Sequence, residues 1–142
     1  MMLYRPVGLG ELRLIAEARF EQYPPRLPDQ PIFYPVLTLE YARKIARDWN
    51  STDVQSGYIG FVTRFEIDAE AVARYPVQRA GGSAHEELWV PSEELAEFNR
   101  HIIGPIAIVE VYPGPKFSGA IDPQSLLPSE WIPHALPANW PP

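Results

Sequence analysis

The sequence predicts an α+β protein in which small, mostly antiparallel sheets are flanked by about three helices and followed by a proline-rich C-terminal arm. Segments rich in β-branched and aromatic residues alternate with amphipathic helical patterns, and the connections between them are short. Hydrophobic residues make up 46% of the 142 residues, which is ordinary for a globular protein. The 17 prolines are concentrated towards the C-terminal end. We therefore expect a domain over residues 1–112 and an arm over residues 113–142.

Composition narrows the possible functions. The net charge is −6 and no basic run occurs, which argues against non-specific nucleic-acid binding. The chain has no cysteine, so a disulfide scaffold and a thiolate metal site are both excluded, and its three histidines lie too far apart to predict a metal site. No signal peptide and no apolar run of membrane-spanning length is visible, so we expect a cytoplasmic protein without membrane contact.

The first third of the chain predicts a strand, a helix and a stiff connector. Residues 3–7 form a short apolar strand that ends at a glycine. Leucine and isoleucine then recur at helical spacing over residues 9–20. Residues 23–28 contain three prolines, which bias the backbone towards extended conformations and exclude a helix there.

The middle third predicts a strand over residues 31–36, a helix and the strongest strand of the chain. Thr38 is a suitable N-cap for the helix, whose apolar residues form one broad face up to Trp49. Residues 57–67 are dominated by β-branched and aromatic side chains, which favour a strand.

The last third of the domain predicts several shorter elements. We expect Ser92 to cap the second of its helical segments and Gly104 to end it. The expected elements are one helical turn at 68–74, an edge strand at 77–78, a Gly81-Gly82 turn, a strand at 85–90, a helix at 92–102 and a strand at 106–112.

The arm carries large apolar side chains among its prolines, including Phe117, Leu127, Trp131 and Trp140. A disordered linker seldom contains so many of them. We expect the arm to pack onto the domain or onto a neighbouring subunit, so a homodimer through the arm is one alternative.

The expected strand at 85–90 contains the most informative residues. Side chains alternate between the two faces of a strand, so Glu86 and Glu87 point in opposite directions. One of these carboxylates faces the packed side of the sheet, where it needs a partner or a function.

Three segments together resemble the ADP-ribosyltransferase fold family, in the branch that uses an arginine, a polar middle motif and a glutamate, and in particular its small bacterial members. They are Leu3-Tyr4-Arg5, the sequence Ile-Phe-Tyr-Pro-Val-Leu-Thr at 32–38 with the helix after it, and His-Glu-Glu-Leu-Trp-Val-Pro at 85–91. The likeness covers residues 3–112 and depends on the order and spacing of the segments. It implies a fold of split antiparallel sheets.

The resemblance also implies a function, namely NAD-dependent ADP-ribosyl transfer or cleavage of the bond between nicotinamide and ribose, with NAD as the substrate. Such pentosyl-transferring enzymes pass through a transition state that resembles an oxocarbenium ion. Glu87 is then the catalytic carboxylate, with His85 two residues before it on the same face. The implied NAD-binding residues are Arg5, Tyr34, Thr38 and Tyr41. We expect Arg5, Tyr34 and Glu87 to converge on one cleft.

The acceptor stays open, whether a protein, a nucleic acid or a small molecule. His85 stands where many family members carry Gln or Glu, and Tyr-Pro-Val-Leu-Thr replaces the familiar Ser-Thr-Ser. The main alternative is a non-catalytic nucleotide- or protein-binding module that retains the fold. An RNA 2′-phosphotransferase-like activity ranks last, because the net charge of −6 does not suit an RNA-binding surface.

Each candidate also has a purely structural interpretation. Arg5 could pair with an acid such as Glu11, and Thr38 could serve only as an N-cap. Tyr34 and Tyr41 occupy apolar positions, where buried tyrosines usually have a bonded hydroxyl group.

Overall fold

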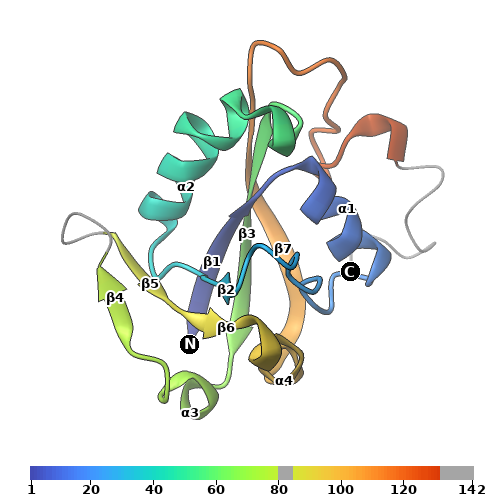
Figure 1. Ribbon diagram of the computed structural model, residues 1–142. Helices are drawn as coiled ribbons and strands as arrows, with labels where there is room; N and C mark the ends of the chain where they lie inside the picture. Colours follow the sequence, from blue (N-terminus) through green and yellow to red (C-terminus); the bar gives the residue numbers. More distant parts are fainter. Residues whose placement is uncertain (80–84, 132–142) are drawn as a thin grey trace.

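The computed structural model describes residues 1–79 and 85–131 and shows a mixed α+β protein with three main helices and several small antiparallel sheets (Figure 1). The strands are β1 (Met2–Val7), β2 (Ile32–Phe33), β3 (Ile59–Ile67), β4 (Val77–Arg79), β5 (Glu86–Leu88), β6 (Val90–Pro91) and β7 (Ile102–Pro113). The α-helices are α1 (Leu9–Glu17), α2 (Leu39–Asp48), α4 (Leu95–Arg100) and the single turn α3 (Ala69–Val72). Within the described residues, 3-10 turns also lie at Asn50–Thr52, Val54–Ser56, Ser92–Glu94 and Ser129–Trp131. The predicted α+β class is confirmed at this level.

The largest sheet is antiparallel and has the order β1-β3-β7. Its last strand is longer than predicted, because it begins at Ile102 and includes Gly104. The expectation that Gly104 ends a helix was therefore wrong. Its φ of +76° falls within the strand, near a shift of the β3–β7 register between Arg64 and Glu66. Glycine adopts this conformation without steric cost.

Two shorter sheets, β2-β6 and β4-β5, lie beside the large one. The predicted strand at 31–36 is divided into β2 and a single bridging residue, Val36. Pro35 between them lacks an N–H group and cannot donate to a ladder. Val36 pairs with Tyr4 of β1 on one side and with Glu87 of β5 on the other. Residues 35–37 therefore connect the small sheets to the large one.

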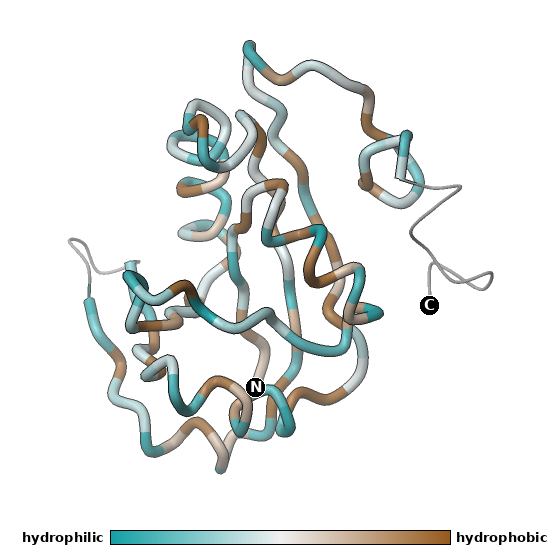
Figure 2. Tube along the Cα trace, turned by 45° about the vertical axis from the view of Figure 1, so that its right-hand side comes forward, coloured by the Kyte–Doolittle hydropathy of each residue, from teal (hydrophilic) through white to brown (hydrophobic). Residues whose placement is uncertain are grey.

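Helices α1 and α2 cover opposite faces of the central sheet (Figure 1). On the α1 face, Leu12 and Ile15 pack with Phe61 and Phe65 in the larger core cluster. On the α2 face, alanines of the helix pack against Val62 in a smaller cluster. Hydrophobic and hydrophilic residues alternate along these elements, as Figure 2 shows. The apolar residues of these elements thus build two cores, one on each face of the sheet.

Helix α1 and strand β3 are both shorter than predicted because their ends turn. Arg19 and Phe20 adopt positive φ angles of 58° and 59°, so the helix does not continue to residue 20. Gly57 and Tyr58 adopt positive φ angles of 74° and 64° before β3 begins.

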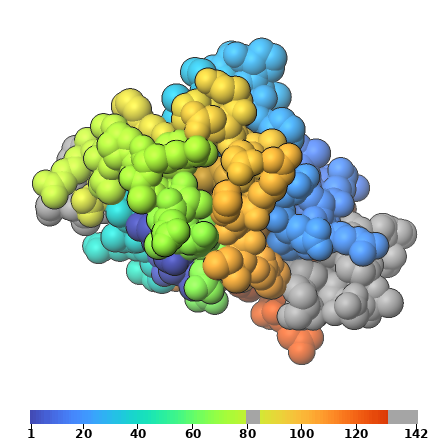
Figure 3. Space-filling model, turned by 90° about the horizontal axis from the view of Figure 1, so that it is seen from below, coloured from blue at the N-terminus to red at the C-terminus, as the bar shows by residue number. Residues whose placement is uncertain are grey.

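The proline-rich connector after α1 lies against the segment that contains α4 (Figure 3). The Asn99 side chain accepts a hydrogen bond from the Tyr23 N–H at 3.0 Å and donates one to the Tyr23 carbonyl at 3.0 Å. The Ser92 N–H donates to the Pro31 carbonyl.

Ser92 does not act as the predicted N-cap, because it lies inside a 3-10 turn that precedes α4. A pocket of about 330 Å³ lies in this region, and none of the candidate site residues lines it.

The arm packs onto the domain as far as the structure describes it. Leu127 is fully buried, Trp131 is 5% exposed, and both belong to the core cluster on the α1 face. Arg13 of α1 lies over the Trp131 ring, with 5.4 Å between the guanidinium carbon and the ring centroid.

The Gly81-Gly82 turn and the arm from residue 132 onwards lie outside the described residues. Within the described residues, no helix is long and apolar enough to cross a membrane.

Candidate functional site

Of the two neighbouring carboxylates, which alternation predicted to lie on opposite faces of the strand, Glu87 is the one that faces the packed side of the sheet. It is the middle residue of β5 and is 8% exposed. Backbone bonds fix the strand on both sides of it, because Leu37 donates to the Glu86 carbonyl and Leu88 donates to the Pro35 carbonyl. Glu86 points the other way and forms an ion pair with Arg79 at 3.6 Å.

Two neutral donors hold the Glu87 carboxylate. The Tyr41 hydroxyl donates to Oε2 at 3.1 Å, and the Trp89 indole Nε1 donates to Oε1 at 2.8 Å. Among residues 1–79 and 85–131, no cation forms an ion pair with Glu87. The negative charge is therefore fixed in position by hydrogen bonds and is not neutralised by a neighbour.

Helix α2 supplies Tyr41 from its first turn. The Thr38 side chain accepts a hydrogen bond from the Tyr41 N–H at 3.1 Å, which confirms Thr38 as the N-cap. Burial, together with the charge and hydrogen bond of Glu87, raises the pKa of Tyr41 to about 12. The phenol is therefore a firm hydrogen-bond donor at neutral pH, as the structural interpretation of a bonded tyrosine hydroxyl expected.

His85 lies next to these groups. Its imidazole stacks on the Tyr41 ring with a centroid separation of 4.6 Å and an interplanar angle of 15°. The structure therefore brings together Glu87, His85 and Tyr41, three of the predicted site residues, and adds Trp89 to them. Trp89 lies two residues after Glu87, and no local pattern in the sequence indicates that its indole would donate to this carboxylate.

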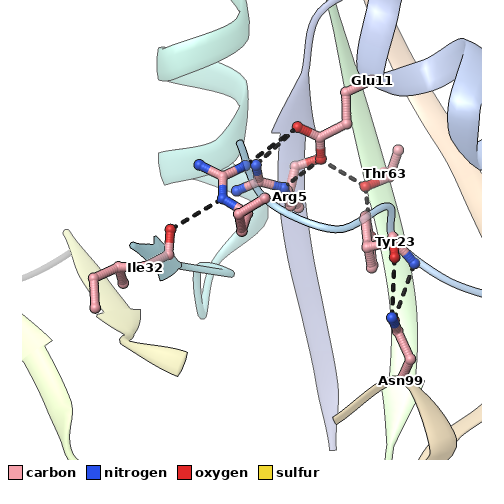
Figure 4. A network of polar contacts seen from close by, with 7 residues as sticks. Arg5, Glu11, Tyr23, Ile32, Thr63 and Asn99 are labelled. Carbon is pink, nitrogen blue, oxygen red and sulfur yellow. Dashed lines mark hydrogen bonds and ion pairs between the residues drawn. The ribbon is translucent and has the colours of Figure 1, made fainter. Parts of the chain in front are cut away.

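Arg5 belongs to a separate group of contacts on β1 (Figure 4). It is 5% exposed and donates to Glu11 from Nε at 2.6 Å and from Nη2 at 2.9 Å. The alternative pairing of Arg5 with Glu11 is thus confirmed. Burial lowers the pKa of Arg5, but the contact with Glu11 outweighs it and the net shift is upwards. That Arg5 also binds a dinucleotide stays a prediction.

Tyr34 lies at the edge of the Arg5 group and is 42% exposed, unlike a core aromatic residue. The guanidinium carbon of Arg5 lies 5.6 Å from the Tyr34 ring centroid and 4.7 Å from that of Phe33. Tyr34 also contributes to the raised pKa of Tyr41. It is therefore close enough to influence both groups electrostatically.

The side chains of Arg5 and Glu87 point to opposite faces of the connected sheet. Tyr4 and Glu87 both pair with Val36, and directly opposed residues project to the same face. Tyr4 packs in the cluster of α2, and Tyr41 reaches Glu87 on that face. Arg5 follows Tyr4 and so projects to the α1 face. The expected convergence of Arg5 and Glu87 on one cleft is not what these contacts show.

Among the residues that the structure describes, no group of three or more His, Cys, Asp or Glu side chains could hold a metal ion. No family model, curated protein or solved structure matches the chain.

Proposed function

We propose that the chain has an ADP-ribosyltransferase-like fold and that the group of Glu87, Tyr41, His85 and Trp89 binds the nicotinamide ribose of NAD and cleaves its glycosidic bond. One observation carries this proposal, namely the fixed, unneutralised carboxylate of Glu87 between two aromatic donors. The resemblance of the segments at 32–38 and 85–91 to that family supports it, whereas Arg5 projects to the other face of the sheet and is not part of this group.

The charge of Glu87 suits the chemistry. The nicotinamide ring of NAD is a cation, and when its bond to C1′ breaks, the electron pair leaves with neutral nicotinamide and the positive charge moves to the ribose. A preorganised carboxylate stabilises that charge without having to reorient. A carboxylate already paired with an arginine could not do this as well, because its field would be largely cancelled.

The neighbouring side chains have distinct roles in this mechanism. Tyr41 and Trp89 hold the two carboxylate oxygens in place, and their rings offer surfaces on which a cationic ring can stack. We assign to His85, whose ring stacks on Tyr41, the acceptance of the proton that water or another nucleophile loses when it attacks C1′. The products are nicotinamide and either ADP-ribose or an ADP-ribosylated acceptor.

A second candidate function is a binding module that does not catalyse cleavage. The observation that favours it is the burial of Glu87, which is 8% exposed and already accepts a bond on each oxygen. In that case NAD, or another ligand with a cationic ring, would bind without release of nicotinamide.

Nicotinamide release from NAD distinguishes the two functions. We expect release by the wild-type protein and a loss of about a hundredfold or more in Glu87→Gln, as for the removal of a preorganised electrostatic group. Glu86→Gln is the matched control, because its carboxylate lies next in sequence but on the other face, paired with Arg79. It should keep a rate close to wild type.

Two results would contradict a catalytic role. One is wild-type release in Glu87→Gln, which would remove Glu87 from the mechanism. The other is binding of NAD by the wild type with no release of nicotinamide, which would favour the binding module. Circular dichroism of each variant shows whether its fold is retained.

A further inference from the structure

Two arginines on the α1 face share a single carboxylate. Arg5 makes two hydrogen bonds to Glu11, and Nη1 of Arg26 in the connector lies 3.7 Å from Oε1 of the same Glu11. Two positive charges therefore meet one negative charge, and the group carries a surplus of one positive charge.

This surplus lies in a largely enclosed position. The side-chain exposures are 6% for Arg5, 10% for Arg26 and 20% for Glu11. Burial and the charge of Arg5 lower the pKa of Arg26, while Glu11, Tyr34 and Asp29 act in the opposite direction. Among the described residues, Asp29 forms no ion pair with Arg26. A buried, uncompensated guanidinium is costly unless an anion joins it.

The two arginines also retain unused donors. Nε of Arg26 donates to the Ile32 carbonyl at 3.1 Å, but its Nη1 and Nη2 make no hydrogen bond to the described residues, and neither does Nη1 of Arg5. These nitrogens are not fully enclosed. In the described part of the chain, the fully enclosed side-chain atom that lacks a hydrogen-bond partner is Oδ1 of Asn50, and none of the arginine nitrogens is such an atom. Each of these nitrogens therefore keeps some contact with solvent.

We propose that Arg26 and Arg5 form a binding site for a phosphate or pyrophosphate group of a nucleotide, with the exposed Tyr34 at its rim. The planar fork of a guanidinium matches the geometry of phosphate oxygens. Figure 4 shows the Arg5 and Glu11 part of this site beside the Ile32 carbonyl. The site does not depend on cleavage at Glu87, which lies on the opposite face of the sheet.

The competing interpretation is purely structural. In that view Arg26 only ties the connector to β1 through Glu11 and to the β2 backbone through Ile32. Such a role predicts a change in stability when Arg26 is replaced, but no affinity for anions.

Calorimetric titration with inorganic pyrophosphate and with ADP tests the site directly. We expect both to bind the wild-type protein, and Arg26→Gln to weaken binding about tenfold or more, because it removes charge-assisted hydrogen bonds. Arg26→Lys, which keeps the charge but loses the fork, should fall between the two. Arg13→Gln is the matched control, since Arg13 is 54% exposed and its ion-pair partner is Glu17 on the same helix.

Further titrations distinguish this phosphate site from the proposed site of NAD cleavage. Glu87→Gln should leave the affinity for ADP and pyrophosphate unchanged. Competition by NAD against ADP would show that the site also accepts the pyrophosphate of NAD, whereas simultaneous binding would show that NAD binds elsewhere on the protein. The proposal is overturned if the wild type binds neither probe, if folded Arg26→Gln binds as tightly as the wild type, or if Arg13→Gln loses as much affinity as Arg26→Gln.

Discussion

The two faces of the sheet hold their buried charges in different ways. On the α1 face, Arg5 is neutralised by a bidentate contact with Glu11, at 2.6 and 2.9 Å. On the α2 face, Glu87 is held by a phenol and an indole, and no described cation pairs with it. Both side chains are less than a tenth exposed, so burial alone does not distinguish them.

This difference indicates which group is structural and which is available for chemistry. An arginine that is paired with a carboxylate stabilises the fold provided both partners remain, and the carboxylate largely cancels its electric field. A carboxylate fixed by neutral donors keeps its full charge for a ligand. Arg5 therefore stabilises the fold through Glu11, and the surplus positive charge of that group comes from Arg26, which shares the same carboxylate. Glu87, by contrast, is suited to bind a cation or to stabilise one that forms.

The largest effect should follow from removal of Arg5. Arg5→Met leaves Glu11 without its main partner, and we expect a loss of about 3 kcal/mol in the free energy of unfolding, since Glu11 keeps only the longer contact with Arg26. Glu87→Gln should cost about 1 kcal/mol or less, because no buried cation is left behind. Urea denaturation measures both.

A surface pair provides the control for this comparison. Arg79 is 69% exposed and pairs with Glu86 at 3.6 Å, so Arg79→Gln should change the free energy of unfolding by about 0.5 kcal/mol or less. If Arg5→Met were as mild as Arg79→Gln, the structural role assigned to Arg5 would be wrong.

A smaller effect concerns the titration of Tyr41. The neutral phenol is favoured in the folded protein, with a pKa raised to about 12 from the ordinary value of 10.0 by burial and by Glu87. The resulting stabilisation is complete below pH 10 and is lost as the pH rises towards 12. Spectrophotometric titration, with Tyr41→Phe subtracted to isolate this phenol, should show the raised pKa.

The same titration of Tyr41 in Glu87→Gln tests whether the Glu87 charge contributes to the raised pKa. Loss of the neighbouring negative charge should move the pKa of Tyr41 back towards its ordinary value. A pKa that does not respond to this substitution would mean that the contact between Tyr41 and Glu87 is not maintained in solution.

Much of the fold could be predicted because it depends on local patterns. The apolar residues of β1, the β-branched and aromatic residues of β3 and the Thr38 cap of α2 each leave a signal in the sequence. The errors occurred where non-local pairing decides the structure. Gly104 resembles a helix stop, but pairing with β3 draws it into β7. Strand 31–36 is interrupted at Pro35, and Val36 bridges two sheets.

Individual residues of the site could be predicted from the sequence, but the way in which they lie relative to one another could not. Alternation put Glu86 and Glu87 on opposite faces, the resemblance singled out Glu87, and Glu87 is the buried one of the two. The opposite orientations of Arg5 and Glu87 follow from the bridge at Val36, which joins strands far apart in the sequence. Arg26 was missed because a proline-rich connector gives no periodicity from which to infer where its side chain points.

The most direct test is whether Glu87 recognises positive charge on a nicotinamide ring. Calorimetric titration can compare a non-hydrolysable analogue of oxidised NAD, whose ring is cationic, with NADH, whose ring is neutral. We expect the cationic analogue to bind the wild type about tenfold more tightly, equivalent to about 1.4 kcal/mol, and the preference to disappear in Glu87→Gln. Equal affinity for both ligands in the wild type, or no binding of either, would contradict the role proposed for Glu87.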